Sequence, residues 1–192
     1  IDDLTSQGIQ FIENNKEIPF LAYFPYNTPH SPMQVPDEFW DRYENKPLAQ
    51  EGRLAELEDS VHTKAALAMT ENLDWNVGRI VQKLEELNLM KNTIVIYFSD
   101  NGPNGHRWNG NMKGIKGNTD EGGIRSPFII QWKGNLEKGT TVNNITSVLD
   151  IFPTLVELAG IQNEQARPFD GLSLKNLLTK NQDAAVNDRI IP

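Results

Sequence analysis

Three short apolar runs, separated by segments of helical character, constrain the fold of this chain more than any other feature. The runs cover residues 20–24, 93–98 and 127–132, and each is apolar at nearly every position. A strand that is apolar on both faces is typical of a parallel sheet covered by helices on both sides. We therefore predict an α/β fold with a mostly parallel sheet and helices on both of its faces.

The longest helical pattern lies between the first two of these runs. Over residues 54–87, apolar residues recur every three or four positions, as they do on one face of an amphipathic helix. Shorter helices are expected over residues 1–17 and from about residue 150 to residue 159. Gly78 interrupts the long pattern at a cost of about 1 kcal/mol relative to alanine. We therefore expect Gly78 to allow close packing against a neighbouring element.

The composition excludes several classes of protein. Lysine and arginine total 18 against 26 aspartate and glutamate residues, a net charge of −8, which argues against a broad nucleic-acid surface. No apolar run approaches the roughly 20 residues of a membrane span. Because cysteine is absent, this stretch contains no disulfide, thiolate metal site or cysteine nucleophile. The chain begins at Ile1 without a methionine and stops at Pro192 without a polar tail, so we expect a piece of a longer protein.

A proline-rich loop follows the first apolar run. Residues 25–47 contain five prolines, and a loop of this length inside a compact domain is often functional. Pro29 and Pro32 flank His30 and stiffen the backbone that presents it. A rigid histidine can hydrogen-bond a substrate anion. Taken by itself, however, His30 is better explained as a structural loop residue.

Asp100, Asn101 and Gly102 stand at the carboxyl end of the second run, where ligands gather in sheets of this class. A carboxylate and an amide oxygen suit a hard cation such as Ca²⁺ or Mg²⁺. The same tripeptide is also a good turn, and two ligands are too few for a tight site. An EF-hand is excluded because the twelfth position counted from Asp100 is Asn111 rather than glutamate.

The region after this tripeptide is a series of loops. His106 and Arg107 lie where they could form the rim of a pocket, and residues 112–125 are rich in glycine and include Lys113 and Lys116. Glycines allow the backbone to approach a ligand closely, and a lysine supplies a charge for an oxyanion. On composition alone this region is a surface loop. His62, on the long helix beside its apolar stripe, is expected to be a surface or packing residue.

In combination, these features resemble the sulfatases of the alkaline-phosphatase-like superfamily, particularly the arylsulfatase A type. The resemblance spans nearly the whole chain. It implies that residues 1–192 are the C-terminal portion of a sulfatase catalytic domain, with an alkaline-phosphatase-like sheet that is incomplete here. Four main blocks and two weaker ones carry it: residues 19–23 with 29–32, 73–80, 94–102, and 113–117 with 121–127, then 150–155 and 170–174.

The resemblance also implies roles for individual residues. Asp100 and Asn101 would be ligands of an active-site divalent cation, usually Ca²⁺, with Mg²⁺ possible. His30 would contact the sulfate ester or its leaving oxygen. Lys116 would bind the sulfate, and it is preferred over Lys113 because many relatives carry arginine at the position of Lys113.

Further implied features lie in the variable loop or outside the chain. His106 and Arg107 are expected to contact the substrate, although no motif residue transfers to them. The nucleophile of the family is a formylglycine made within a Cys/Ser-x-Pro-x-Arg motif, which does not occur in this sequence. The paired aspartates that complete the metal site and the N-terminal Lys/His pair of relatives are also missing. Asp2 and Asp3 are not that aspartate pair, because they open a helix rather than follow a strand.

The implied activity is hydrolysis of sulfate monoesters, on sulfated carbohydrates or aryl sulfates, in a periplasmic or secreted protein. No nucleic-acid partner and no membrane span are expected, and the chain alone is predicted to be inactive without its N-terminal portion. Alternatives are a phosphatase or phosphonate hydrolase of the same superfamily, a non-catalytic carbohydrate-binding homologue, and an interaction domain. The Asp-Asn pair and Lys116 favour sulfate, because phosphatases with two zinc ions need more His and Asp ligands than this chain offers.

Overall fold

A computed structural model describes residues 1–162, 167–180, 184–187, 189 and 191. The chain divides into two compact units, residues 1–131 and residues 132–192. All six residues singled out for the active site lie in the first unit.

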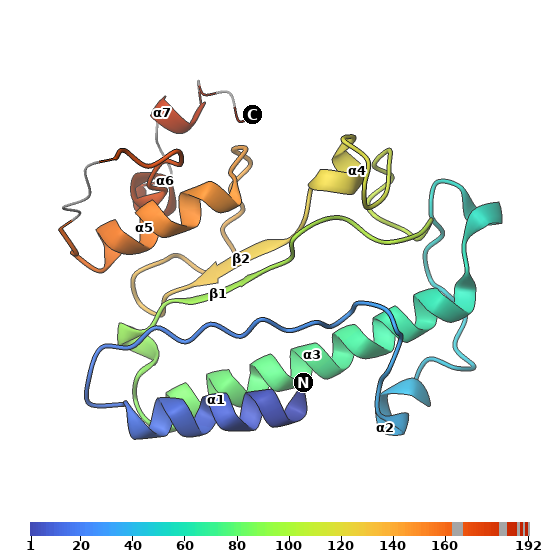
Figure 1. The fold of residues 1–192 in the computed structure, drawn as a ribbon, viewed down its shortest axis with the longest axis horizontal. Helices are drawn as coiled ribbons and strands as arrows, with labels where there is room; N and C mark the ends of the chain where they lie inside the picture. The colour runs from blue at the N-terminus through green and yellow to red at the C-terminus, as the bar shows by residue number, and fades with distance from the viewer. Residues whose placement is uncertain (163–166, 181–183, 188, 190, 192) are drawn as a thin grey trace. The chain divides into compact units, whose positions relative to one another are not determined.

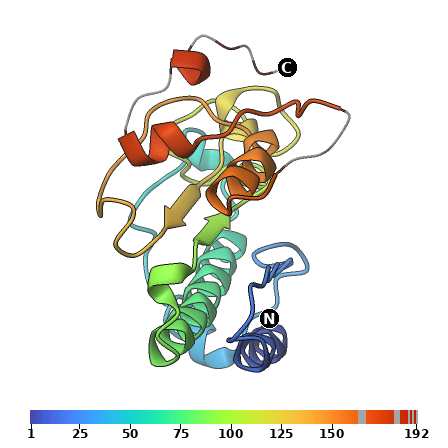
Figure 2. The same cartoon turned by 90° about the vertical axis from the view of Figure 1, so that its left-hand side faces the viewer.

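Two helices that run side by side in the same direction form the base of the first unit (Figures 1 and 2). They are α1, Asp2–Asn14, and α3, Ser60–Glu86. The apolar faces of both helices meet in a buried cluster, which also takes in Met90 from the short 3-10 helix η2, Met90–Asn92. The other cluster members are Ile12, Ile80 and Leu84. The predicted helices are therefore present, with ends that differ from the expected ones.

The start of α3 is set by a helix cap. Asp59 precedes the first turn and its side chain accepts a hydrogen bond from the His62 amide at 3.0 Å, which satisfies one of the free N–H groups of that turn. The residues before it form a separate 3-10 helix, η1, Ala55–Leu57. The apolar periodicity begins at residue 54, so it places the start of the helix too early. None of the described helices is long and apolar enough to cross a membrane.

Asp2 ties the two helices together by polar contacts. Its carboxylate accepts hydrogen bonds from the Asn72 and Asn76 side chains at 3.1 and 2.7 Å. Burial opposes ionisation of Asp2, but these two hydrogen bonds together with nearby positive charge, including that of Arg79, outweigh it and lower the pKa of the carboxyl group. Asp2 and Asp3 lie in the first turn of α1, which confirms that this acidic pair opens a helix.

The first apolar run is extended but is not a strand, so this prediction was wrong. Phe20, Ala22 and Phe24 are half-buried, and both phenylalanines pack on the cluster between α1 and α3. The alternate side chains Leu21 and Tyr23 are 77% and 74% exposed. The period of two is that of a strand. Within the described residues, however, the segment has no strand neighbour to complete a ladder.

The two other apolar runs form the sheet of the first unit. β1, Val95–Phe98, pairs with β2, Phe128–Gln131, in the register Val95↔Gln131 to Phe98↔Phe128. The pairing is antiparallel, whereas the sequence predicted mostly parallel strands. A parallel pair needs a crossover that returns the chain to the same end of the sheet. The segment between β1 and β2 contains only the short helix α4, Glu121–Ile124, and loops, so the chain reverses direction instead.

Two further features concern the face of α3. Helix α2, Asp37–Trp40, interrupts the proline-rich loop and buries Phe39 beside Trp75, with 6.2 Å between their ring centroids. Gly78, by contrast, is exposed, and apart from its chain neighbours and the adjacent backbone of its own helix, no described atom lies within 4 Å of the position of an added Cβ. The expectation that Gly78 permits close packing was therefore wrong for this part of the chain.

The second unit consists of short helices around a small apolar cluster. They are η3, Val148–Asp150, α5, Ile151–Leu158, α6, Lys175–Lys180, and α7, Ala184–Asn187. The helix predicted from about residue 150 to 159 corresponds to the end of η3 and to α5. Asp150 is fully buried, where it accepts hydrogen bonds from the Ser147 and Leu172 amides at 2.8 and 2.9 Å and pairs with Arg189.

Candidate active site

A close approach of two backbone segments positions the end of β1. The Gly102 amide donates a hydrogen bond to the Gly123 carbonyl at 2.9 Å. An added Cβ on Gly102 would lie 1.8 Å from the Gly122 carbonyl oxygen, so only glycine fits at this position. The loop is therefore held against α4 at Gly102, directly after Asp100 and Asn101.

The glycine-rich loop is anchored to the same place. The Lys116 amide donates to the Pro103 carbonyl at 2.9 Å, one residue beyond Gly102. Gly114 and Gly117 adopt φ values of +91° and +90°, which allow the sharp turns on either side of Lys116. This folding places the Lys116 backbone beside the loop that follows β1.

The two candidate lysines differ in their partners. Lys113 Nζ forms an ion pair with Asp120 at 3.1 Å on an exposed part of the loop. Lys116 Nζ instead lies 3.2 Å from His30 Nε2, from a residue 86 positions away in the sequence. The geometry thus separates a lysine paired within its own loop from a lysine that meets the histidine of the proline-rich loop.

The contacts of His30 indicate which tautomer it adopts. A lysine ammonium can only donate, so His30 Nε2 accepts from Lys116. His30 Nδ1 lies 2.7 Å from the Ser31 carbonyl oxygen, which can only accept, so Nδ1 carries the proton. In this tautomer the lone pair of Nε2 is directed at Lys116.

Asp100 and Asn101 offer oxygen donors of the kind that hard cations bind. Asp100 is exposed and Asn101 is half-buried, and no hydrogen bond or ion pair occupies the Asp100 carboxylate among the described residues. In the same part of the chain, no three His, Asp or Glu side chains gather closely enough to hold a metal ion. The pair thus fits as part of a cation site, whose remaining ligands must come from elsewhere.

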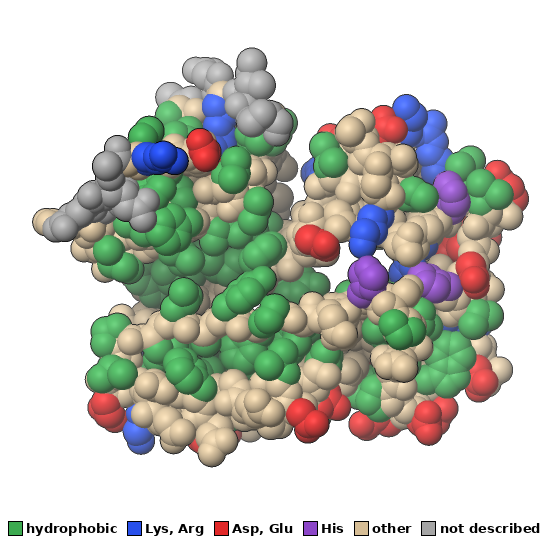
Figure 3. All heavy atoms as spheres, in the orientation of Figure 1, with side chains coloured by type: hydrophobic (Ala, Val, Ile, Leu, Met, Phe, Trp, Pro, Cys, Tyr) green, Lys and Arg blue, Asp and Glu red, His purple; other side chains and the backbone are tan. Residues whose placement is uncertain are grey.

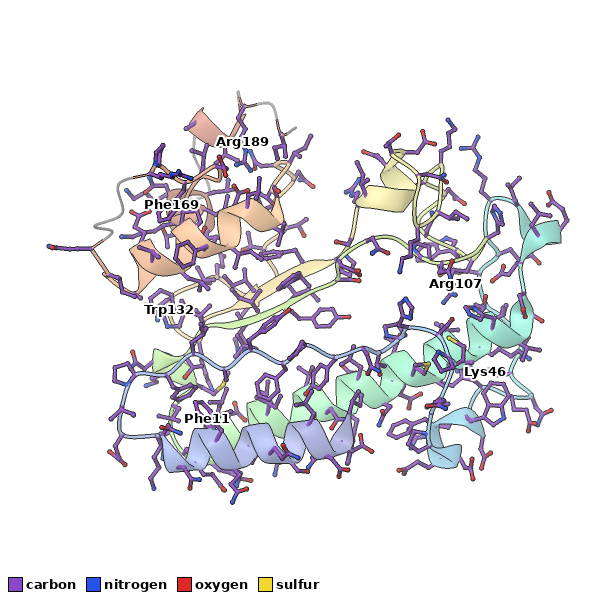
Figure 4. The ribbon with its side chains drawn as sticks, viewed as in Figure 1. Phe11, Lys46, Arg107, Trp132, Phe169 and Arg189 are labelled. Carbon is purple, nitrogen blue, oxygen red and sulfur yellow. The ribbon has the colours of Figure 1, made fainter. Side chains whose placement is uncertain are left out.

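A second set of contacts begins one residue from His30. Ser31 Oγ lies 3.4 Å from His62 Nε2, and His62 Nδ1 accepts from Arg107 Nη2 at 2.9 Å. Figure 4 shows Arg107 between the loop that follows β1 and the first turns of α3. Burial lowers the pKa of Arg107, while the nearby Glu58 and Asp59 act in the opposite sense. The guanidinium remains charged, because arginine does not deprotonate in proteins.

His62 is the residue that sequence reasoning missed. It was expected at the surface or in packing, yet it connects Ser31 with Arg107. No local pattern could reveal this, because its partners lie far away in the sequence. His106 and Arg107 both line one cavity, which agrees with the expectation that they form the rim of a pocket. In the face of the molecule that Figure 3 shows, the histidine side chains gather in one area, beside lysine and arginine side chains.

Comparison with known proteins decides the family. The model of the sulfatase family matches residues 1–161 of the chain. The chain belongs to the sulfatase family. It is 35% identical to human arylsulfatase H over 187 residues, which cover 91% of this chain and 30% of the relative. It is 34% identical to rat steryl-sulfatase over 185 residues, which cover 91% of this chain and 29% of the relative.

Solved structures show that the fold is that of other sulfatases. The crystal structure of Ps i-CgsB in complex with k-i-k-neocarrahexaose is 30% identical, with a TM-score of 0.81 over 95% of this chain and 39% of that chain. The predicted alkaline-phosphatase-like α/β fold is confirmed by this likeness. The chain spans about 30% of the length of the curated relatives that it matches.

Proposed function

We propose that the protein to which this chain belongs hydrolyses sulfate monoesters, and that this chain is the C-terminal portion of its catalytic domain. The observation that carries the proposal is the 3.2 Å contact between Lys116 Nζ and His30 Nε2 in a chain of the sulfatase family. Two groups of this kind suit a sulfate ester, since one can bind the anion and the other its leaving oxygen.

Lys116 and His30 must separate for the substrate to bind between them. The Lys116 ammonium then exchanges its hydrogen bond to His30 for one to a sulfate oxygen, and it offsets the negative charge that spreads over the sulfate during bond cleavage. His30 Nε2 is then free to face the leaving oxygen. It acts there as a general acid once it carries a proton, while Nδ1–H remains bound to the Ser31 carbonyl.

Two groups would complete this chemistry. Asp100 and Asn101 would supply part of the ligand set of a divalent cation, Ca²⁺ or Mg²⁺, and a formylglycine outside this chain would provide the nucleophile. The cation would add electrostatic stabilisation of the sulfate oxygens, as metal ions commonly do for transferred anionic groups. Gly102 follows this pair directly and lies against Gly122, so the placement of Asp100 and Asn101 toward that cation would depend on this close backbone contact.

Sulfated carbohydrates are the substrate class that we propose. Support comes from Ps i-CgsB, whose structure contains an oligosaccharide and which is 30% identical to this chain. A phosphatase of the same superfamily is the competing activity, and a non-catalytic carbohydrate-binding homologue is the competing non-enzymatic function.

The test is hydrolysis of 4-nitrophenyl sulfate and 4-nitrophenyl phosphate by the full-length protein, produced together with a formylglycine-generating enzyme and supplied with Ca²⁺. We expect sulfate turnover, and we expect Lys116→Ala to lower kcat by about 10²–10³-fold. Lys113→Ala is the matched control, because it removes an ion-paired lysine from the same loop. Phosphate turnover without sulfate turnover would contradict the proposal, as would equal losses in the two lysine variants.

A further inference from the structure

His30 belongs to a chain of hydrogen bonds that extends beyond its contact with Lys116. His30 Nδ1 lies 2.7 Å from the Ser31 carbonyl oxygen, and the hydroxyl oxygen of the same serine lies 3.4 Å from His62 Nε2. His62 Nδ1 in turn lies 2.9 Å from Arg107 Nη2. Ser31 therefore contacts the His30 ring through its backbone and the first turns of α3 through its side chain.

The contacts of His62 indicate which tautomer it adopts. A guanidinium can only donate, so His62 Nδ1 accepts from Arg107 and the proton of the ring lies on Nε2. The Ser31 hydroxyl donates to Met33 Sδ at 3.7 Å, which leaves its oxygen able to accept from His62 Nε2–H. At 3.4 Å this last bond is long, and hydrogen bonds of catalytic sites commonly shorten when substrate binds. Arg107 thus selects the tautomer of His62 that can bind Ser31.

The chain of hydrogen bonds closes into a ring at the loop after β1. Arg107 Nη2 also donates to the Asn104 carbonyl at 3.0 Å, and the Lys116 amide donates to the carbonyl of the preceding Pro103 at 2.9 Å. Both ends of the chain are therefore fixed to adjacent residues of one loop. Because the members of such a network hold one another in place, the loss of one member affects the others.

His62 is suited to hold another residue rather than to react. Its ring nitrogens are both engaged, one by Arg107 and the other by Ser31, so neither is left for a substrate. Its backbone lies in the first turn of a long helix, whose start is fixed by the Asp59 cap at 3.0 Å. His30, by contrast, lies on an exposed loop. The ring of hydrogen bonds thus connects an exposed loop histidine to a rigid helix.

We infer that His62 is a positioning residue for His30. Through Ser31 it fixes the tautomer and the orientation of the His30 ring, so that Nε2 faces the leaving oxygen once Lys116 has turned to the sulfate. The inference rests on the proposed function for the role of His30 as general acid. It assigns to His62 no contact with the substrate.

The chemistry of the leaving group supplies a readout that a loss of stability would not change. Phenolate is a poor leaving group, as is the alkoxide of a sugar, so departure of either depends on a proton from His30. 4-Nitrophenolate leaves readily without one, because the nitro group delocalises its charge. A variant in which His30 is misplaced therefore loses more activity on phenyl sulfate than on 4-nitrophenyl sulfate.

The first experiment measures kcat/KM of the full-length protein on these two substrates. In His62→Leu, the loss on phenyl sulfate is expected to exceed the loss on 4-nitrophenyl sulfate by about 10-fold or more, a part of the 10²–10⁴-fold that a general acid typically contributes. His62→Gln is expected to recover most of this difference. Its amide oxygen can accept from Arg107 while its amide N–H donates to Ser31.

Asn72→Ala is the matched control. It also removes a polar side chain of α3, but one that bonds to Asp2 at 3.1 Å rather than to the ring. It should change kcat/KM on both substrates by the same factor. Equal losses on the two substrates in His62→Leu, or a glutamine variant that behaves like the leucine variant, would overturn the inference.

The second experiment requires no hydrolysis and records ¹⁵N–¹H correlation spectra of the histidine rings in the full-length protein in alkaline buffer, assigned with His30→Gln and His62→Gln. Wild type should show the proton of His62 on Nε2 and that of His30 on Nδ1. In His62→Leu, the His30 signals are expected to shift toward a mixture of both tautomers, and an unchanged His30 spectrum would overturn the inference. A changed spectrum in a protein that hydrolyses no sulfate ester would support the role of His62 and contradict only the proposed function.

Discussion

Replacing Gly102 by alanine tests whether close backbone packing positions the site. The added Cβ would lie 1.8 Å from the Gly122 carbonyl oxygen and 2.8 Å from its carbon, and real Cβ atoms essentially never approach other atoms to under 3.0 Å. The two segments must therefore separate by about 1.2 Å, the difference between 3.0 and 1.8 Å. Both contacts are to backbone, so rotation of a side chain cannot relieve them.

This separation has two expected consequences. Overpacking of this kind typically costs about 1–3 kcal/mol in the free energy of unfolding. A misplacement of about 1 Å at a reacting group costs about 10²-fold in rate. Because Asp100 and Asn101 precede Gly102 and the Lys116 amide binds the next carbonyl, all three would move together. We therefore expect kcat/KM of Gly102→Ala to fall by about 10²-fold.

The assay is kcat/KM on 4-nitrophenyl sulfate, together with urea unfolding, for the full-length protein and the variant. Gly78→Ala is the matched control, because it makes the same substitution in the first unit where an added Cβ meets no described atom. A Gly102→Ala variant with kcat/KM within about threefold of wild type and unchanged unfolding free energy would refute the reasoning, since the backbone segments would then be free to separate without effect.

Two further predictions concern stability and are measured by urea unfolding. Gly78→Ala should raise the free energy of unfolding by about 1 kcal/mol, because alanine favours the helix and meets no clash; a decrease would show that Gly78 has a packing role. Asp150→Ala should lower it by about 3–5 kcal/mol, because Arg189, whose side chain is only 14% exposed, loses its partner. Burial opposes ionisation of Asp150, but Arg189 and the Ser147 and Leu172 amides outweigh it and lower its pKa. This stabilisation is thus present above the unfolded pKa of Asp150 and is lost as pH falls through its lower folded pKa. The difference in the free energy of unfolding between wild type and Asp150→Ala should therefore shrink below about pH 4. A difference that does not change with pH would contradict the argument.

Local sequence patterns predicted the elements of the first unit better than their partners. The apolar period of α3 and the runs that contain β1 and β2 could be recognised because each pattern repeats within a few residues. The run at residues 20–24 has the same composition, but a strand exists only where a second strand supplies hydrogen bonds. Its extended backbone was therefore predictable, and its lack of a described partner was not.

For the candidate site, too, some features were predictable from the sequence and others were not. The motif pattern of the family singled out His30, Asp100 and Lys116 as site residues, and their roles stay a prediction. The contact of Lys116 rather than Lys113 with His30, by contrast, depends on turns at Gly114 and Gly117, whose positive φ values arise from the folded loop.

The amino-acid sequence by itself determined the helical and extended segments, the family resemblance and the residue types available for chemistry. Only the tertiary structure decided that β1 and β2 run antiparallel, that Gly102 lies against Gly122, and that His62 connects Ser31 with Arg107. The physical reason is the range of the interactions. Periodicity and capping act within a few residues, whereas these contacts join segments whose separation along the chain carries no repeating signal.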